Sequence, residues 1–255
     1  MYIRFIKHLT NSGIRVFSTK RARQIAIDLD INPSTILSTL HRLEKKKVVT
    51  RLMKGIYCLA PEFLTGIPIH EYEIALALAD PSAISHLSAM SYHKLTDQIS
   101  SIVYVLTLSE KERERSSYST YVLRGITYRI IRTKKEWYWG IEKKWLASAH
   151  IEVTDLERTL IDGLLKPKYC GGFREVLDAF DQAKERIDYP KIISYAQKIS
   201  ASACKRLGWV VSHLKVDPKY LEILKKNISA SYTKLDTSRP SKGKWNQEWY
   251  IIENL

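Results

Sequence analysis

Glu157, Arg158 and Asp162 come closest to a catalytic arrangement in this sequence. Two carboxylates and a guanidinium on one helix could support acid–base chemistry. The same residues also have a structural interpretation, because Thr154 and Glu157 have the spacing of a capping box and Arg158 and Asp162 are four residues apart. We favour this interpretation, in which Arg158 pairs with Asp162 and the helix over 155–165 packs through its leucines. We therefore predict no catalytic residue.

His86 and His93 are seven residues apart and so share one face of a predicted helix, with Asp97 following. A metal site needs a third ligand, and the sequence has no H-E-x-x-H spacing. We interpret the histidines as a hydrogen-bonded pair at a helix surface, and we expect neither a metal nor a cofactor. The three cysteines are too far apart for close zinc-binding pairs and are predicted to be buried hydrophobic residues: Cys58, Cys170 and Cys204.

Other catalytic motifs are missing from the sequence. It has no G-x-x-x-x-G-K-[ST], G-x-G-x-x-G or G-x-S-x-G motif, and no paired acidic signature of a nucleotidyltransferase. The run Trp137-Tyr138-Trp139 could stack on unpaired bases, but packing in a core or interface explains it equally well and is our preferred interpretation.

Residues 33–46 carry polar side chains in a pattern that could read DNA. Asn32 can cap this predicted helix and Pro33 suits its first position. One face is apolar and is formed by Ile36, Leu37, Leu40 and Leu43. The opposite face has hydroxyls first and cations later, which suits the major groove: Ser34, Thr35, Ser38, Arg42 and Lys45. If Arg42 contacts a base, replacing it with Ala should weaken operator binding by roughly 1–3 kcal/mol.

The elements around this helix predict a winged helix-turn-helix over residues 1–62. Helices over 2–10 and 19–29 precede it, and strands over 48–52 and 56–59 follow as a hairpin in which Gly55 supplies a positive φ. Arg51 and Lys54 lie on this wing, where they would reach the adjacent DNA backbone or minor groove. The predicted DNA-binding residues are Lys20, Arg21, Arg23, Ser34, Thr35, Ser38, Arg42, Lys45, Lys46, Arg51 and Lys54.

The charge supports a polyanionic partner at this end of the chain. The 255 residues contain 41 Lys or Arg and 27 Asp or Glu, a formal net charge of +14. Residues 1–60 hold twelve of the cations and three of the anions, so they carry nine of these net positive charges. A hydrophobic content of 45% excludes global disorder. Without an apolar stretch of ~18 residues or a signal peptide, we expect a cytoplasmic protein that does not enter membranes.

The remainder, residues 70–255, is predicted to be a larger mixed α/β domain after a linker at 61–68, which gives an α+β fold overall. Helices are expected over 70–79 and 86–95, and strands over 102–108, 120–123, 126–131 and 151–153. Five more helices follow over 155–165, 173–186, 189–200, 203–214 and 217–227, and then strands over 231–235 and 248–253.

Several blocks of this domain resemble the AbiEi antitoxin family. They are Ile84–Gln98, which ends in L-T-D-Q, Leu156–Leu164 with Pro167, Tyr169 and Gly171-Gly172, Lys205–Trp209, Leu235-Asp236, Gly243, Trp249 and Asn254. The blocks occur in family order over roughly residues 84–254. The sequence departs from the family at Thr237-Ser238, where a proline is common, and this puts the geometry of that loop in doubt.

The resemblance implies a repressor that binds operator DNA at inverted repeats and regulates its own operon. It also implies an antitoxin of a type IV abortive-infection system, which counteracts a nucleotidyltransferase toxin without binding it stably. The alternative is a DNA-directed nuclease that uses the winged helix for targeting. Because no compact Asp…Glu-x-Lys cluster is present, we favour a protein that is not an enzyme. A plasmid-nicking assay with Mg²⁺ distinguishes the two hypotheses.

Overall fold

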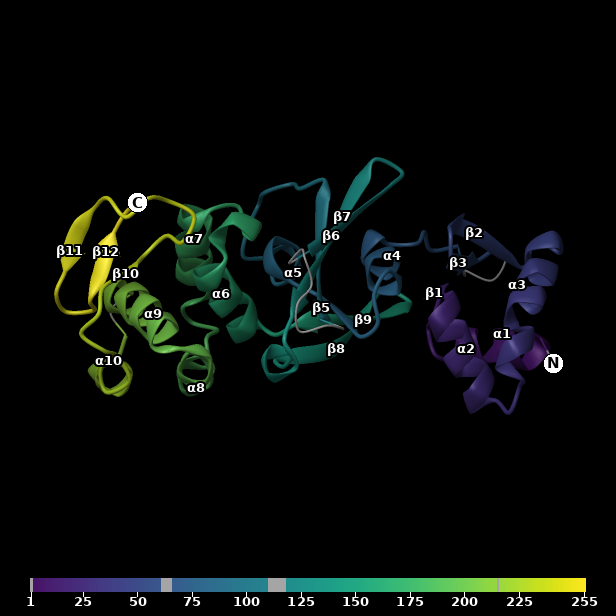
Figure 1. The fold of residues 1–255 in the computed structure, drawn as a ribbon, viewed down its shortest axis with the longest axis horizontal. Helices are drawn as coiled ribbons and strands as arrows, with labels where there is room; N and C mark the ends of the chain where they lie inside the picture. Colours follow the sequence, from purple (N-terminus) through teal and green to yellow (C-terminus); the bar gives the residue numbers. More distant parts are fainter. Residues whose placement is uncertain (1, 61–65, 110–117, 215) are drawn as a thin grey trace. The chain divides into compact units, whose positions relative to one another are not determined.

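A computed structural model describes residues 2–60, 66–109, 118–214 and 216–255. The chain divides into two compact units. Unit 1 comprises Met1–Ile84, Ser101–Lys135 and Glu142–Val153, and unit 2 comprises Ser85–Ser100, Glu136–Ile141 and Thr154–Leu255. Both units combine helices with strands, so the α+β class expected from the sequence is confirmed (Figure 1).

Unit 1 begins with three helices and a small sheet. In chain order they are α1 (Tyr2–Asn11), β1 (Val16–Ser18), α2 (Thr19–Asp28), the 3₁₀ turn η1 (Pro33–Thr35), α3 (Ile36–Lys45), β2 (Val49–Met53) and β3 (Ile56–Leu59). The strands form an antiparallel sheet in the order β1-β3-β2. The helices and the β2–β3 hairpin occur in the order that the sequence predicts, and the winged helix-turn-helix itself stays a prediction (Figure 1).

One aromatic cluster joins these elements into a core. The ring of Phe17 on β1 meets Phe5 edge-on at 6.0 Å and stacks on Tyr57 at 6.2 Å between centroids. From α3, the core takes Ile36, Leu40 and Leu43. Leu37 was expected on the same face, but it is 50% exposed. That expectation was wrong. Each residue is rotated by about 100° from the one before it, so Leu37 lies away from the face shared by Ile36, Leu40 and Leu43.

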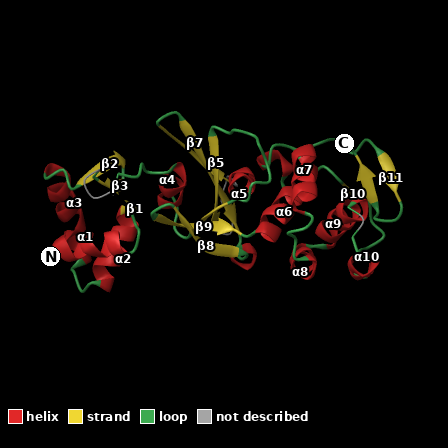
Figure 2. Cartoon of the chain, turned by 180° about the vertical axis from the view of Figure 1, so that it is seen from behind, coloured by secondary structure: helices red, strands yellow, loops and turns green. Residues whose placement is uncertain are grey.

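The rest of unit 1 is built on a six-stranded mixed sheet with the order β6-β7-β5-β4-β9-β8 (yellow in Figure 2). Its strands are β4 (Ser82–Ile84), β5 (Ile102–Leu108), β6 (Tyr118–Leu123), β7 (Ile126–Thr133), β8 (Ile141–Leu146) and β9 (Ala149–Thr154). Helix α4 (Glu71–Ala77) packs on β1, β4 and β5. The short 3₁₀ segment η3 (Lys135–Trp137) precedes β8.

Two pairings in this sheet are parallel, β5 with β7 and β4 with β9. The hairpin β6–β7 turns at Arg124 and Gly125, both with positive φ, as expected from the sequence. Strands β4 and β8 were missed. The first has only three residues, and the second contains Glu142, Lys143 and Lys144, which are poor strand formers.

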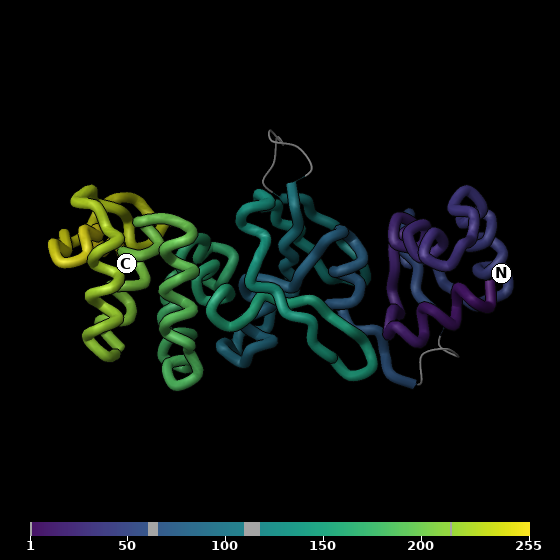
Figure 3. Tube along the Cα trace, turned by 90° about the horizontal axis from the view of Figure 1, so that it is seen from below, coloured from purple at the N-terminus to yellow at the C-terminus, as the bar shows by residue number. Residues whose placement is uncertain are grey.

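Unit 2 is mostly helical. It contains α5 (His86–Tyr92), α6 (Leu156–Leu165), the 3₁₀ turn η4 (Pro167–Tyr169), α7 (Phe173–Ala183), α8 (Tyr189–Ile199), α9 (Ala201–His213) and α10 (Pro218–Lys225). A three-stranded sheet completes it, with β10 (Thr233–Lys234), β11 (Lys244–Asn246) and β12 (Ile251–Glu253). Helix α6 packs against α5, α7, α8 and α9, and helices α8, α9 and α10 pack against one another. Figure 3 shows α8, α9 and α10 in green to yellow-green.

The two compact units do not coincide with the predicted domains 1–62 and 70–255. The described part of residues 70–255 contributes the six-stranded sheet to unit 1, which also contains α1–α3 and β1–β3. The predicted linker lies partly outside the described residues, at 61–65. The domain boundary therefore stays a prediction. Among the described residues, no helix combines the length and apolar character that crossing a membrane requires.

Candidate nucleic-acid interface

Helix α3 begins with a compact capping arrangement. The side chain of Asn32 caps η1 by accepting a hydrogen bond from the Ser34 backbone N–H at 3.0 Å. Ser34 Oγ also donates to Asn32 Oδ1 at 2.8 Å, and Thr35 Oγ1 donates to the Asn32 carbonyl at 2.8 Å. The Asn32-Pro33 start predicted from the sequence is present, but the first turn is 3₁₀ and the α-helix begins at Ile36.

These hydroxyls have consequences for how α3 could read DNA. Ser38 Oγ donates to the Thr35 carbonyl at 2.8 Å, so the hydroxyl hydrogens of all three predicted readers are used locally. Each oxygen keeps lone pairs that can accept from the amino groups of adenine or cytosine. A hydrogen bond to a phosphate, which is an acceptor only, would require the hydroxyl to rotate. The structure therefore favours Ser34 and Ser38 as acceptors.

The exposed face of α3 is wider than the sequence analysis proposed. Ser34, Ser38, Arg42 and Lys45 are exposed and Thr35 is partly exposed. His41 is also exposed, and it is rotated about 100° from Leu40 around the helix, on the same side as Lys45. The sequence analysis missed it, although projecting residues 34–45 at about 100° per residue would have found it. No described carboxylate forms an ion pair with Arg42, Lys45 or Lys46.

The wing adds further exposed cations. Lys54 occupies the turn between β2 and β3, beside Gly55 with φ +81°. Arg51 is exposed on β2, and its Nε donates weakly to the Met53 carbonyl at 3.4 Å across an irregularity in the strand register. Both side chains therefore lie exposed on the β2–β3 hairpin, and their contact with DNA stays a prediction.

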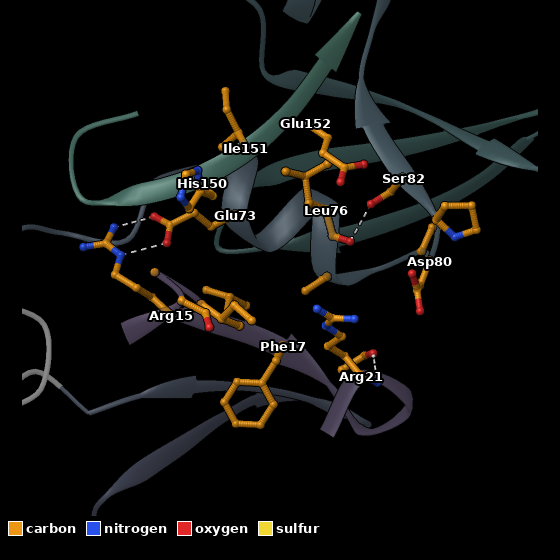
Figure 4. A pocket seen from close by; sticks show the side chains of 18 of the residues that line it. Arg15, Phe17, Arg21, Glu73, Leu76, Asp80, Ser82, His150, Ile151 and Glu152 are labelled. Carbon is orange, nitrogen blue, oxygen red and sulfur yellow. Dashed lines mark hydrogen bonds and ion pairs between the residues drawn. The ribbon is translucent and has the colours of Figure 1, made fainter. Parts of the chain in front are cut away.

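The predicted residues of α2 have different surroundings. Lys20 Nζ donates to the Asp80 carbonyl at 3.0 Å and lies 3.9 Å from that residue's carboxylate. Arg21 lines a cavity of about 510 Å³ within unit 1, together with His150 and Glu152 (Figure 4). Arg23 is exposed. Lys20 and Arg21 are exposed like the cations of α3 and the β2–β3 hairpin, but Lys20 is bonded to Asp80.

Arg15 shows that the basic excess is not all available to a partner. It forms a buried ion pair with Glu73, with Nε donating to Oε2 at 2.8 Å and the other nitrogen donating to Oε1 (Figure 4). Arg15 also donates to the Ile67 and Pro68 carbonyls and to Ser148 Oγ, at 2.9–3.1 Å. The carboxylate raises the pKa of Arg15. This cation connects β1 to α4 and is closed to a ligand.

A second charged cluster lies in unit 2 around α6. As predicted, Arg158 pairs with Asp162, with Nε donating to Oδ1 at 2.9 Å while both side chains are nearly buried. The predicted capping box at Thr154 is wrong. Asp155 caps α6 by accepting from the Arg158 N–H at 2.7 Å, because it directly precedes the first helical residue. Glu157 instead accepts from the Asp188 N–H at 3.0 Å and pairs with Lys191 at 2.8 Å.

Most polar atoms of this cluster have partners within it, although the buried Asp162 Oδ2 has no hydrogen-bond partner among the described residues. Asp155 Oδ2 accepts from Tyr195 Oη at 2.8 Å and lies 3.1 Å from Lys191 Nζ. Burial and the Asp155 hydrogen bond raise the pKa of Tyr195 to about 12. The Trp139 ring lies between Arg158 at 4.4 Å and Lys198 at 4.5 Å, and it contacts Tyr195. Trp139 therefore packs, as we interpreted it, whereas Trp137 of the same run is 38% exposed.

The two histidines of the L-T-D-Q block do not form a surface pair, so that interpretation was wrong for His86. His86 is 2% exposed, Nδ1 is hydrogen-bonded to Ser85 Oγ at 2.9 Å, and burial lowers its pKa to about 4. His93 Nε2 is instead hydrogen-bonded to the Thr154 carbonyl at 2.7 Å. The helix over these residues is enclosed by unit 2, which its sequence alone does not indicate. Across the described residues, no group of three or more His, Cys, Asp or Glu is placed to hold a metal.

The blocks that resemble the AbiEi family have structural roles in unit 2. Thr96 donates to Glu175 Oε1, and Gln98 Nε2 donates to Oε2 at 2.6 Å. Gln98 also covers Gly171, where a Cβ would lie 2.6 Å from its Oε1. At Gly208 a Cβ would lie 2.0 Å from the Trp249 ring, so only glycine fits there. The residues of these blocks therefore hold the elements of unit 2 together through hydrogen bonds and close packing.

The resembling residues near the end of the chain also form hydrogen bonds that hold unit 2 together. Lys205 is buried and donates to Ser231 O and, at 3.3 Å, to Ser229 Oγ. Asn254 Oδ1 accepts from the Asp236 N–H and its Nδ2 donates to the Asp236 carbonyl, both at 2.9 Å. The loop at Thr237-Ser238, which departs from the family, is closed by Asp236 Oδ1, which accepts from the Ser238 N–H at 2.8 Å. All three cysteines are buried, as predicted.

Comparison with known proteins shows a likeness in fold. No family model matches the chain, and no curated protein matches it. Among solved structures, the chain is similar to the crystal structure of the RV2827C protein from Mycobacterium tuberculosis, with a TM-score of 0.59 and 13% sequence identity. The match covers 99% of this chain and 91% of the other. At this identity it shows a shared fold and carries no function.

Proposed function

We propose that this protein is a sequence-specific DNA-binding transcriptional repressor that reads its operator with the exposed face of α3 and contacts the flanking backbone with the wing. One observation carries the proposal. The cations of α3 are exposed and have no carboxylate among the described residues, whereas Arg15 and Arg158 elsewhere are buried in ion pairs. Unpaired surface cations around hydroxyl and imidazole groups match the mixture of phosphate and base contacts in DNA recognition.

The proposal extends to the biological role through the resemblance of residues 84–254 alone. On that basis the protein represses its own operon from inverted repeats. It serves as the antitoxin of a type IV abortive-infection system in the cytoplasm, where it opposes a nucleotidyltransferase toxin without a stable complex. The structural roles of the resembling blocks support this division of labour, because they build unit 2 rather than a catalytic site.

DNA binding is tested with the duplex upstream of the protein's own reading frame and a scrambled duplex of equal composition, at physiological salt. We expect the own-operator duplex to bind more tightly. Lys45→Ala and Lys54→Ala should weaken that binding, because each removes an exposed cation from the interface. Lys184→Ala is the matched control: it removes an exposed cation of unit 2 and should bind as the wild type does. Equal binding of both duplexes overturns the proposal.

The antitoxin role is tested first by whether a nucleotidyltransferase reading frame lies beside this gene, and then in cells that express that enzyme. We expect the full-length protein to restore growth, and we expect the double variant Lys45→Ala/Lys54→Ala to restore it as well while failing to repress the promoter. Such a result separates the two activities. If neither protein restores growth while both are expressed and folded, the antitoxin role is wrong and the repressor role stands on its own test.

A further inference from the structure

A small cavity of about 260 Å³ opens beside the C-terminal half of α3 within unit 1. Its lining comes from α3 and from the first residue of α1, namely Tyr2, Thr39, Arg42, Leu43 and Lys46. The α3 residues are spaced three, four and seven apart, so they form one continuous strip along the helix. Lys46 Nζ lies 5.0 Å from the centre of the Tyr2 ring, which holds the ammonium group at the rim.

Thr39 contributes a buried hydroxyl with nothing to bind. It is 4% exposed, and its Oγ1 has no hydrogen-bond partner among the described residues. A threonine inside a helix ordinarily donates to the carbonyl four residues earlier. Here that carbonyl, on Thr35, accepts from Ser38 Oγ instead. The Thr39 hydroxyl hydrogen is therefore available at the wall of a cavity, where an unsatisfied polar group is unfavourable.

The charged residues that line the cavity are both cations. Arg42 and Lys46 are four residues apart on the helix, a spacing at which like charges repel. None of the lining residues is acidic, and no described carboxylate pairs with either cation. Two cations and a free hydroxyl donor around one hollow match the needs of a phosphate, which accepts hydrogen bonds and carries negative charge.

The strip runs from the reading face to one flank of the helix. At about 100° per residue, Ser38 and Arg42 each lie about 20° from the direction opposite the buried Leu40, on either side of it. Lys46 and Thr39 lie about 60° and 80° from that direction, progressively further toward the flank that begins at Arg42. A helix that inserts its centre into the major groove brings its flanks to the sugar–phosphate backbone, where contacts position the protein without reading sequence.

We propose that this cavity is a phosphate pocket that receives one phosphodiester of the DNA backbone at the edge of the major groove. Arg42 and Lys46 supply the charge, and the Thr39 hydroxyl donates to a phosphate oxygen. This inference rests on the proposed DNA-binding function and deepens it. It also reassigns Arg42, which the sequence analysis placed among the base readers, to the backbone.

Salt dependence is the first test. Binding constants of wild type, Arg42→Gln, Lys46→Gln and Thr39→Val are measured on operator and scrambled duplexes over a range of salt concentrations. Each cation variant should weaken both duplexes by the same factor and lower the salt slope by about 1. Thr39→Val, which keeps the shape of the side chain, should weaken binding to both duplexes several-fold. It should not lower the melting temperature of the protein. His41→Ala, from the reading face, should instead reduce the preference for operator.

The second test locates the phosphate. Operator duplexes carrying one neutral methylphosphonate at successive positions are bound to wild type and to Arg42→Gln. We expect one position on each half-site to weaken the wild type and to leave Arg42→Gln unaffected, because the variant has already lost that contact.

The outcomes are distinct from those of the proposed function. A loss confined to the operator, with an unchanged salt slope, makes Arg42 a base reader and overturns the phosphate pocket. Wild-type binding by Thr39→Val overturns the role of the hydroxyl. If the wild type does not prefer its operator at all, the proposed function itself fails, whatever the variants do.

Discussion

On α3, Arg42 and Lys45 extend from the helix with no described carboxylate beside them, whereas around α6 Arg158 and Lys191 lie 2.8–3.1 Å from carboxylate oxygens. The residue types are the same in both regions. Their surroundings differ, since the first group is exposed and the second is buried or half-buried. From the sequence, catalysis is a candidate role for the α6 group and DNA binding is a candidate role for the α3 group. The two groups differ in that the α6 cations are paired with carboxylates and the α3 cations are not.

The two regions show that a charged side chain can act on the stability of the fold or on the affinity for a partner, depending on its burial. A buried pair is stabilising only as a pair, because removing one partner leaves an uncompensated charge in a poorly solvated site. An exposed cation costs the fold little and remains free to displace counterions from a polyanion. Substitutions should therefore affect stability in unit 2 and DNA affinity on α3.

The largest effect is expected for Arg158→Met. It leaves Asp162 buried without its cation and removes the hydrogen bonds to the Trp137 and Trp139 carbonyls. The free energy of unfolding should fall by about 3–5 kcal/mol. Urea unfolding measures it, with Lys184→Met, from an exposed pair with Asp181, as a control that changes stability by less than about 0.5 kcal/mol. Equal losses for the two variants would break the comparison.

The next effect concerns pH. Burial lowers the pKa of His86 to about 4, below its usual value of 6.5, so the folded protein keeps this side chain neutral while the unfolded chain protonates it. Stability is therefore complete above pH 6.5 and is lost as pH falls toward 4, by about 3 kcal/mol in total.

His86→Asn is the control for this titration. It removes the titrating ring, and asparagine tolerates the positive φ of 51° at this position. The free energy of unfolding should change less between pH 7 and pH 4 for the variant than for the wild type. Identical pH profiles would contradict the assignment to His86.

A smaller effect is expected at the start of α3. Asn32→Ala removes the acceptor that binds the Ser34 N–H and hydroxyl, and it should cost about 1 kcal/mol of stability. Asn32→Asp keeps the acceptor and should restore that stability while it weakens DNA binding through its negative charge. Thermal unfolding and operator binding are measured together. A fully stable Asn32→Ala protein would show that the cap is dispensable.

The smallest effect on stability is expected for Lys45→Gln. This exposed side chain has no described partner, so the free energy of unfolding should change by less than about 0.5 kcal/mol. Operator affinity should nevertheless fall. The comparison sharpens if both results hold, and a stability loss above about 1 kcal/mol would make Lys45 a structural residue.

Elements with strong local signals were predictable. The helices of unit 2 and the hairpins at Gly55 and Arg124-Gly125 follow from periodicity and turn chemistry. Strands β4 and β8 were not, because pairing with neighbours rather than propensity makes them strands. At the interface, the exposure of Ser34, Ser38 and Lys45 follows from the helical pattern. The cavity at Thr39 does not, since it depends on where Tyr2 of α1 lies.

The sequence by itself determined most of the helices, the hairpins at Gly55 and at Arg124-Gly125, the basic excess of residues 1–60, and the apolar strip of α3. These depend on local spacing and composition, which act over a few residues. Only the tertiary structure decided which cations are free, because ion pairing depends on distant residues. Arg15 meets Glu73, which is 58 positions away, and is thereby withdrawn from any partner. Arg42 and Lys46 meet no described carboxylate and stay exposed beside a cavity.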